Sequence, residues 1–193
     1  MSLNIEYEDR AMLSSDQYDE ILTDVIRENN NPIFIQQRND YIDTPDLYLK
    51  KHHMVLRIRT IYMGEIELTL KVKGEDGDKE YTQLLPLTAV NEYKSTNILP
   101  EGEAKGILIK EKIDLNNLRI ITYLETRRYQ EKIDDYLLVL DKNFYNNNID
   151  FNIEIEADSI ERAKQVMEMY SKKYNFEHVA CKSKSRRAFE SIK

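Results

Sequence analysis

The chain has 193 residues, 41% hydrophobic and 33% charged, so it is long enough for one domain with a sizeable core, and we expect a single domain over 1–193. Its net charge of −7 argues against DNA and other general nucleic-acid partners, although it does not exclude a local basic cavity for a small anion. No apolar run approaches the length of a membrane span, no signal peptide is visible and Cys181 is the single cysteine. We therefore expect a cytoplasmic protein without a membrane partner. We also expect a monomer or a homodimer.

Hydrophobic periodicity predicts strands and helices in a mixed order. The predicted strands are 5–10, 33–41, 54–61, 65–73, 80–85, 118–133, 136–141 and 149–157. A capping box at 14–17 opens a helix that runs to about Glu28, and a second capping box at 158–161 opens the last long helix. Between them we expect a short helix through Lys51, capped by Thr44 and beginning at Pro45, and one or two short helices within 88–113.

Eight mostly antiparallel strands with helices between and after them predict an α+β protein. Eight strands are enough to close a β-barrel. The apolar faces of the strands need covering, and two amphipathic helices are available to cover them from outside. In that arrangement the charged faces of the strands point inward.

The charged strand faces carry two kinds of chemistry in pairs. The acidic pairs are Glu6/Glu8 and Glu154/Glu156. The basic residues are Arg57/Arg59, Lys71/Lys73 and Lys182/Lys184, with Arg128 between them along the chain. Clustered carboxylates suit a hard divalent ion such as Mg²⁺ or Mn²⁺, whereas several arginines and lysines suit a polyanion. Each face taken alone is typical of a strand whose polar side lies in water, and a β-rich scaffold with solvated charges is therefore the structural alternative.

Short motifs along nearly the whole chain resemble the CYTH family, the triphosphate tunnel metalloenzymes. Glu6-x-Glu8-x-Arg10 looks like the family's N-terminal Glu-x-Glu-x-Lys signature, and 150–156 looks like its second acidic strand. The other similar stretches are 41–45 (Tyr-Ile-Asp-Thr-Pro), 56–59 (Leu-Arg-Ile-Arg), 69–71, 80–83, 126–128, 140–141 and 182–184 with Arg187. The small single-domain bacterial members of the Gram-positive type are the most similar in character.

The resemblance implies an eight-stranded antiparallel tunnel, closed or open on one side, with helices packed outside. It implies that the tunnel binds a triphosphate or polyphosphate with Mg²⁺ or Mn²⁺. The implied metal ligands are Glu6, Glu8, Asp141, Glu154 and Glu156. The implied phosphate-binding residues are Arg10, Arg57, Arg59, Lys71, Lys73, Arg128, Lys182 and Lys184. The implied catalytic residues are Glu8, Arg10 and Glu156.

One position departs from the family pattern, because Arg10 stands where the signature has lysine. Arginine stays protonated, so it binds phosphate but cannot exchange a proton with water. The leading hypothesis is a divalent-metal-dependent triphosphatase with inorganic tripolyphosphate as its first substrate, an organic triphosphate being the other choice. The alternatives are an adenylate cyclase of the same architecture and a non-catalytic module that binds polyphosphate or a nucleotide.

Overall fold

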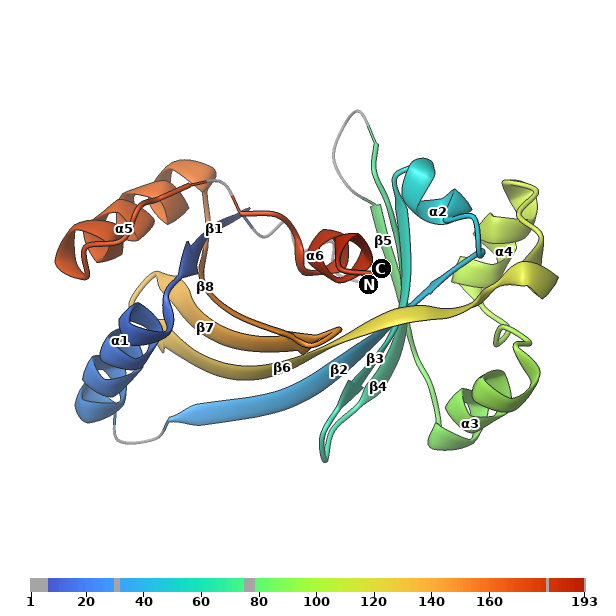
Figure 1. Ribbon diagram of the computed structural model, residues 1–193, viewed down its shortest axis with the longest axis horizontal. Helices are drawn as coiled ribbons and strands as arrows, with labels where there is room; N and C mark the ends of the chain where they lie inside the picture. Colours follow the sequence, from blue (N-terminus) through green and yellow to red (C-terminus); the bar gives the residue numbers. More distant parts are fainter. Residues whose placement is uncertain (1–6, 30–31, 75–78, 180, 193) are drawn as a thin grey trace. The chain divides into compact units, whose positions relative to one another are not determined.

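The computed structural model describes residues 7–29, 32–74, 79–179 and 181–192, whose strands form one antiparallel sheet in the order β1-β8-β7-β6-β2-β3-β4-β5 (Figure 1). The strands are β1 (Tyr7–Leu13), β2 (Ile33–Asp43), β3 (Met54–Ile61), β4 (Ile66–Val72), β5 (Lys79–Leu84), β6 (Arg119–Ile133), β7 (Tyr136–Tyr145) and β8 (Asn148–Ala157). The helices are α1 (Ser15–Glu28), α2 (Tyr48–Lys51), α3 (Leu87–Thr96), α4 (Glu103–Lys110), α5 (Ile160–Lys173) and α6 (Lys184–Glu190), with a 3₁₀ turn at Leu115–Asn117.

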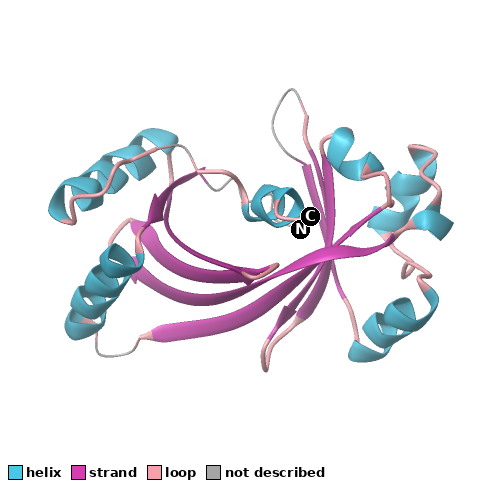
Figure 2. Cartoon of the chain, viewed as in Figure 1, coloured by secondary structure: helices cyan, strands magenta, loops and turns pink. Residues whose placement is uncertain are grey.

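The predicted α+β class and the eight-stranded antiparallel sheet are confirmed (Figure 2). The sheet order ends at β1 and β5, and the described ranges contain no pairing between these two strands. In the part of the chain that the structure describes the sheet is therefore not closed, in agreement with the open form, one of the two that the sequence left possible. None of the helices in the described ranges has the length and apolarity that a membrane span needs.

Three strands are longer than the sequence predicts. β1 continues to Leu13, β2 ends at Asp43 rather than 41, and β7 ends at Tyr145 rather than 141. In β7 the cause is the hairpin to β8, whose ladder stays paired up to Tyr145 opposite Asn148. The two residues between them, Asn146 and Asn147, both have positive φ, as a tight hairpin turn requires. Residues 5 and 6 of the predicted first strand lie outside the described residues.

The predicted capping box at the start of α1 is present. The Ser14 hydroxyl accepts a hydrogen bond from the Gln17 backbone N–H at 3.2 Å, and the Gln17 side chain accepts one from the Ser14 N–H at 2.9 Å. Two N–H groups that the helix cannot satisfy internally are thereby paired. The helix then ends at Glu28, as predicted.

We expect Ser14→Ala to lower the free energy of unfolding by about 1 kcal/mol, because it leaves the Gln17 N–H without its acceptor. Urea unfolding followed by circular dichroism measures the change. Ser95→Ala in the last turn of α3 is the matched control. It is expected to cost less than Ser14→Ala, because the exposed Ser95 hydroxyl donates only to the Glu92 carbonyl of its own helix and its loss leaves no backbone N–H without an acceptor. Equal stability of Ser14→Ala and wild type would contradict the capping role.

The short helix before β3 begins three residues later than predicted. α2 starts at Tyr48, and Pro45 lies in the turn that precedes it. The N-cap is Leu47 rather than the predicted Thr44, and its side chain makes no capping hydrogen bond. The Thr44 hydroxyl nevertheless accepts a hydrogen bond from the Tyr48 N–H at 2.9 Å. Buried Asp43 adds two more acceptors, for the N–H groups of Leu49 at 2.8 Å and Lys50 at 3.0 Å. These hydrogen bonds satisfy the N–H groups of residues 48–50, so the first helical turn begins there rather than at Pro45.

Two further features of the helices differ from the sequence prediction. At α5 the N-cap is Ser159, whose hydroxyl accepts from the Arg162 N–H. The capping box predicted at 158–161 is wrong, because the residue three positions after this N-cap is Arg162, whose side chain cannot accept a hydrogen bond. The basic tail, for which no element was predicted, contains α6. The break predicted within 88–113 is confirmed by the separate helices α3 and α4.

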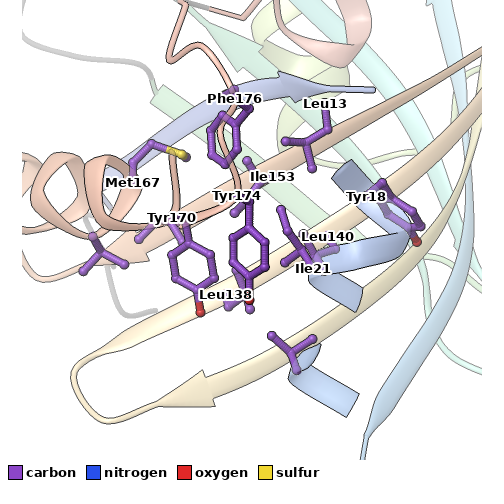
Figure 3. Packing of buried hydrophobic residues seen from close by; sticks show 14 of the residues in the cluster. Leu13, Tyr18, Ile21, Leu138, Leu140, Ile153, Met167, Tyr170, Tyr174 and Phe176 are labelled. Carbon is purple, nitrogen blue, oxygen red and sulfur yellow. The ribbon is translucent and has the colours of Figure 1, made fainter. Parts of the chain in front are cut away.

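The chain divides into two compact units, through both of which β2 and β6 pass. The first unit comprises 1–36 and 126–183, and the second comprises 37–125 and 184–193. In the first unit α1 and α5 pack on the apolar face of β1, β8 and β7, as Figure 3 shows for the side chains around Ile153. The residues at the centre of this core are Ala11, Ile21, Leu138, Leu140, Ile153, Ile155, Ala163 and Met167.

The second unit has its own core on the apolar face of β3 and β4, covered by α2, α3 and α4. Its fully buried members include Leu49, Leu56, Ile58, Leu68, Leu70, Tyr93 and Leu108. The opposite face of these strands carries the charged residues. There α6 packs through Phe189 against the ring of Tyr41, with ring centroids 5.8 Å apart. α6 therefore lies on the other side of β3 and β4 from α3 and α4 (Figure 1).

Candidate active site

The acidic residues of the first unit come together through the pairing of β1 with β8. The register places Glu8 opposite Glu156 and Arg10 opposite Glu154. Side chains on directly opposed residues share a face of the sheet, so Glu8, Glu154 and Glu156 project to the same side. Carboxylate oxygens of Glu8, Glu154 and Glu156 all lie within 4.8 Å of one another. We call these three residues the carboxylate cluster.

The carboxylate cluster has the donor set that a hard divalent cation requires. Each member supplies a carboxylate oxygen, and burial increases from exposed Glu8 through half-buried Glu156 to Glu154, which is only 4% exposed. Three carboxylates this close repel one another unless a cation or a basic side chain compensates them. Their chemistry and proximity fit Mg²⁺ or Mn²⁺. Glu6, the fourth predicted glutamate, lies outside the described residues.

Arg10 lies on the same face and forms an ion pair with Glu8 through its Nη2 atom. Its side chain is 25% exposed, so the guanidinium remains within reach of solvent. The departure from the family's lysine thus places a permanently charged group directly beside one member of the carboxylate cluster.

Arg128 and Asp141 form a buried ion pair beside the carboxylate cluster. Nε and Nη2 of Arg128 donate to the two carboxylate oxygens of Asp141 at 2.8 and 2.9 Å, and Nη2 also reaches Glu154 at 3.1 Å. Burial disfavours the charged guanidinium, but the carboxylates of Asp141, Glu154 and Glu156 outweigh it and raise the pKa of Arg128. Asp141 itself is fully buried and is not a member of the cluster. Arg128 therefore holds Glu154 in place from one side.

A buried polar network continues from Asp141, and the sequence analysis missed it as part of the site. The Asn143 side-chain amide donates to Asn152 at 2.8 Å and to Asp150 at 2.9 Å, and it accepts from the Thr126 hydroxyl at 2.8 Å. Asn152 in turn reaches Asp141 at 3.5 Å. The alternation of β8 could have indicated Asn152, but Asn143 lies beyond the predicted end of its strand.

The predicted phosphate-binding residues Arg57, Arg59 and Lys71 of the second unit share one face of β3 and β4. The register aligns Arg57 with Thr69, and Lys71 with Glu80. Arg59 donates from Nε to the Asn39 side chain on β2 at 3.1 Å. Burial raises the pKa of Tyr41 on this face, while Arg57, Lys184, Arg59 and Arg187 lower it, so several positive charges surround one buried ring.

Glu80 is the acidic counterpart of these cations, and the sequence analysis gave it no role. Its two carboxylate oxygens meet Lys71 Nζ at 2.7 Å and Arg57 Nη2 at 3.4 Å. The ion pairs hold both cations at the charged face of the sheet. The sequence could have indicated this role, because the alternation of β5 places Glu80 and Thr82 on the same face of the strand.

The remaining predicted cations lie outside the strands. Lys73 follows the end of β4 and is exposed. Lys182 is an exposed residue of the first unit, whereas Lys184 begins α6 in the second unit. The sequence predicted that these lysines bind phosphate, and that remains a prediction.

The fold and these groups define a class of protein: an antiparallel sheet that carries a carboxylate cluster suited to a divalent cation and a set of arginines and lysines suited to a polyanion. A profile of the CYTH domain family matches residues 4–189, and the chain belongs to the CYTH family. Its relatives include "Putative triphosphatase YjbK" of Bacillus subtilis (strain 168), which is 31% identical over 190 residues, 98% of this chain and 97% of that protein.

Solved structures with the same fold agree with this assignment. The "putative adenylate cyclase (bh2851)" of Bacillus halodurans has a TM-score of 0.84 and 27% identity, over 96% of this chain and 98% of that chain. "Putative adenylyl cyclase HpAC1" from Hippeastrum, described as having a dominant triphosphatase activity, has a TM-score of 0.78 over 97% of this chain and 96% of that chain. At 19% identity, the second comparison supports the fold alone.

Proposed function

We propose that the protein is a divalent-metal-dependent triphosphatase and that inorganic tripolyphosphate is its first substrate. The observation that carries the proposal is the carboxylate cluster, whose ligand oxygens lie within 4.8 Å of one another. The same chain carries Arg57, Arg59 and Lys71 on one face of the paired strands β3 and β4. The name of the Bacillus subtilis relative supports the same activity. The products would be pyrophosphate and inorganic phosphate, with water as the attacking group.

In this proposal Glu6, Glu8, Glu154 and Glu156 would hold Mg²⁺ or Mn²⁺, with Asp141 behind them. When bound, such an ion polarises a phosphoryl oxygen and makes water a stronger nucleophile at neutral pH. Arg128 keeps the Glu154 carboxylate oriented through its 3.1 Å contact and is itself fixed by Asp141. On the other side of Asp141 the Asn152 amide, itself held by Asn143, donates to Asp141 at 3.5 Å, so the carboxylates are arranged before substrate arrives.

The arginines and lysines bind the phosphate chain and stabilise the charge that develops on it during transfer. Arginine forms paired hydrogen bonds to phosphate oxygens, which suits Arg57, Arg59 and Arg10, and lysine adds a mobile point charge, which suits Lys71. Lys73, Lys182, Lys184 and Arg128 are further phosphate ligands in the proposal. Catalysis of phosphoryl transfer depends mainly on such positioning and charge stabilisation.

A substrate panel tests the proposed activity. Purified protein with Mn²⁺ is incubated with tripolyphosphate, thiamine triphosphate or ATP, and released phosphate and nucleotide products are separated by chromatography. We expect phosphate and pyrophosphate from tripolyphosphate at the highest rate. Cyclic AMP with pyrophosphate from ATP would instead identify an adenylate cyclase, the activity named for the Bacillus halodurans relative.

One observation favours a second candidate, a module that binds polyphosphate without hydrolysing it. Arg10 replaces the family's lysine and pairs with Glu8, so this position cannot exchange a proton. A binding module would show tight tripolyphosphate binding by calorimetry without turnover, and Arg10→Lys would recover turnover. A wild-type protein that hydrolyses tripolyphosphate excludes this candidate.

We expect the double variant Arg57→Gln/Lys71→Gln to bind tripolyphosphate about 100-fold more weakly, because each change removes a charge-assisted hydrogen bond. Isothermal calorimetry in EDTA, where no hydrolysis is expected, measures the dissociation constant. Lys79→Gln is the matched control: Lys79 lies on β5 opposite Val72, on the other face, and its loss is expected to leave binding unchanged. Binding by the double variant at wild-type strength would show that these charges are merely solvated.

A further inference from the structure

The first unit has a cavity of about 410 Å³ on the side of the sheet opposite the carboxylate cluster. It lies between α1, α5 and the turn that joins β6 to β7. Its volume is in the range of small-molecule sites. Aromatic walls come from Tyr136, Tyr170 and Tyr174, each at least nine-tenths buried, and apolar surface comes from Val25 and Ile133.

The three tyrosine rings form two sides of an aromatic pocket. Tyr170 stacks on Tyr174 with centroids 5.9 Å apart, and Tyr136 meets Tyr170 edge to face at 6.4 Å. Figure 3 shows the rings of Tyr170 and Tyr174 side by side with their hydroxyl ends at the same side of the core. The negative faces of such rings attract cations.

The hydroxyl groups in the cavity have hydrogen-bonding capacity left over. Those of Tyr136 and Tyr170 share a single hydrogen bond of 3.3 Å. Two hydroxyls carry two protons, and within the ranges that the structure describes no acceptor is found for the second. Both oxygens also keep lone pairs that can accept a hydrogen bond. A ligand with N–H groups would donate to these lone pairs.

The charges around the cavity are mainly negative. Asp24 and Glu28 of α1 and Glu131 of β6 supply three carboxylates, and Lys173 of α5 supplies one ammonium, which leaves a net charge of −2. Lys173 already places an ammonium group against the cavity wall. Its Nζ lies 4.8 Å from the centroid of the Tyr174 ring and 3.7 Å from Asp24. The carboxylate cluster lies on the opposite face of the sheet from this cavity.

We propose that this cavity binds an aliphatic compound with two or more ammonium groups, such as a short polyamine. Its methylene chain would lie along the tyrosines and the apolar wall, and its ammonium groups would meet the carboxylates and the tyrosine hydroxyls. A bare metal ion would leave the aromatic and apolar walls unused, and an anion would be repelled. The cavity is a second site that stands independently of the hydrolysis proposed above.

Calorimetric titration with spermidine at 150 mM salt tests the proposal. We expect one saturable site in the wild type, and at least ~10-fold weaker binding in Asp24→Asn/Glu28→Gln, which removes the carboxylates of α1. Asp19→Asn/Glu20→Gln is the matched control, because it removes the same charge from exposed residues of the same helix that do not line the cavity. Its dissociation constant is expected to equal that of the wild type.

Several outcomes would overturn the proposal. Equal weakening in the two double variants would mean that spermidine responds only to net charge, and no saturable binding by the wild type would exclude the site. Binding of an oligolysine peptide without binding of spermidine would replace the small-molecule proposal with a basic protein segment. Tyr170→Phe provides a further test with an intact ring, since loss of the hydroxyl alone is expected to weaken spermidine binding several-fold.

Discussion

Replacing Glu156 by glutamine is expected to reduce tripolyphosphate hydrolysis at least ~100-fold while leaving the fold intact. Glu156 lies opposite Glu8 in the sheet and belongs to the carboxylate cluster. Glutamine keeps the size of the side chain but removes its charge, so the cluster loses one of the anionic oxygens that suit a hard cation. Steady-state phosphate release with Mn²⁺ measures the loss.

Two controls make this result specific. Glu177→Gln makes the same change at an exposed residue outside the cluster and is expected to retain full activity. Circular dichroism and the thermal midpoint of Glu156→Gln should match those of the wild type, because Glu156 is only half-buried. A folded Glu156→Gln that hydrolyses tripolyphosphate at the wild-type rate would contradict a catalytic carboxylate cluster.

Asp141→Ala is expected to lower the free energy of unfolding by about 3–5 kcal/mol, the largest stability effect that we predict. Asp141 is fully buried and accepts both hydrogen bonds of the Arg128 guanidinium, at 2.8 and 2.9 Å. Its removal leaves a buried positive charge with only the 3.1 Å contact to Glu154 among the bonds described above. Urea unfolding followed by circular dichroism measures the change.

The double variant Asp141→Ala/Arg128→Met distinguishes an unpaired charge from lost packing. Methionine removes the charge but keeps an apolar side chain of similar length, so the double variant should regain part of the stability that Asp141→Ala loses. The buried ion pair does not stabilise this region if Asp141→Ala lowers the free energy of unfolding by less than about 1 kcal/mol, or if adding Arg128→Met lowers it further.

The sequence was sufficient to predict which residues share a face, because side chains alternate strictly along a strand. On this basis Glu154 and Glu156 share a face of their strand, and the resemblance to the CYTH family grouped them with Glu8. The register of β1 with β8 brings the three residues to one side of the sheet. The same alternation placed Arg57 and Lys71 on one face of β3 and β4. The helix caps of α1 could be predicted for a similar reason, since the bonds of a capping box are local in the chain.

Features that depend on contacts between distant residues could not be predicted in this way. The pairing of Arg128 with Asp141 needs the alignment of β6 with β7, which alternation alone does not set. Asn143 was missed because the run of asparagines after it indicates a turn but not where the ladder stops. α6 was missed because its stability comes from tertiary packing, such as that of Phe189 on Tyr41, rather than from its short basic sequence.

The cavity beside α5 illustrates the same limit for binding sites. Tyr170 and Tyr174 lie on the predicted apolar stripe of the last long helix, where the sequence assigns them to the core. That assignment is correct, since both are buried. Only the structure brings Asp24, Glu131 and Lys173 around the same rings. Tyr170 and Tyr174 therefore pack in the core and also line a charged cavity.

The most direct test of the proposed function is phosphate release from tripolyphosphate by the wild-type protein with Mg²⁺ or Mn²⁺, with EDTA, and after the metal is restored. We predict hydrolysis with either ion, loss of activity with EDTA and full recovery when the metal is added back. Hydrolysis that continues undiminished in EDTA, or no release from tripolyphosphate under any of these conditions, would contradict a metal-dependent triphosphatase.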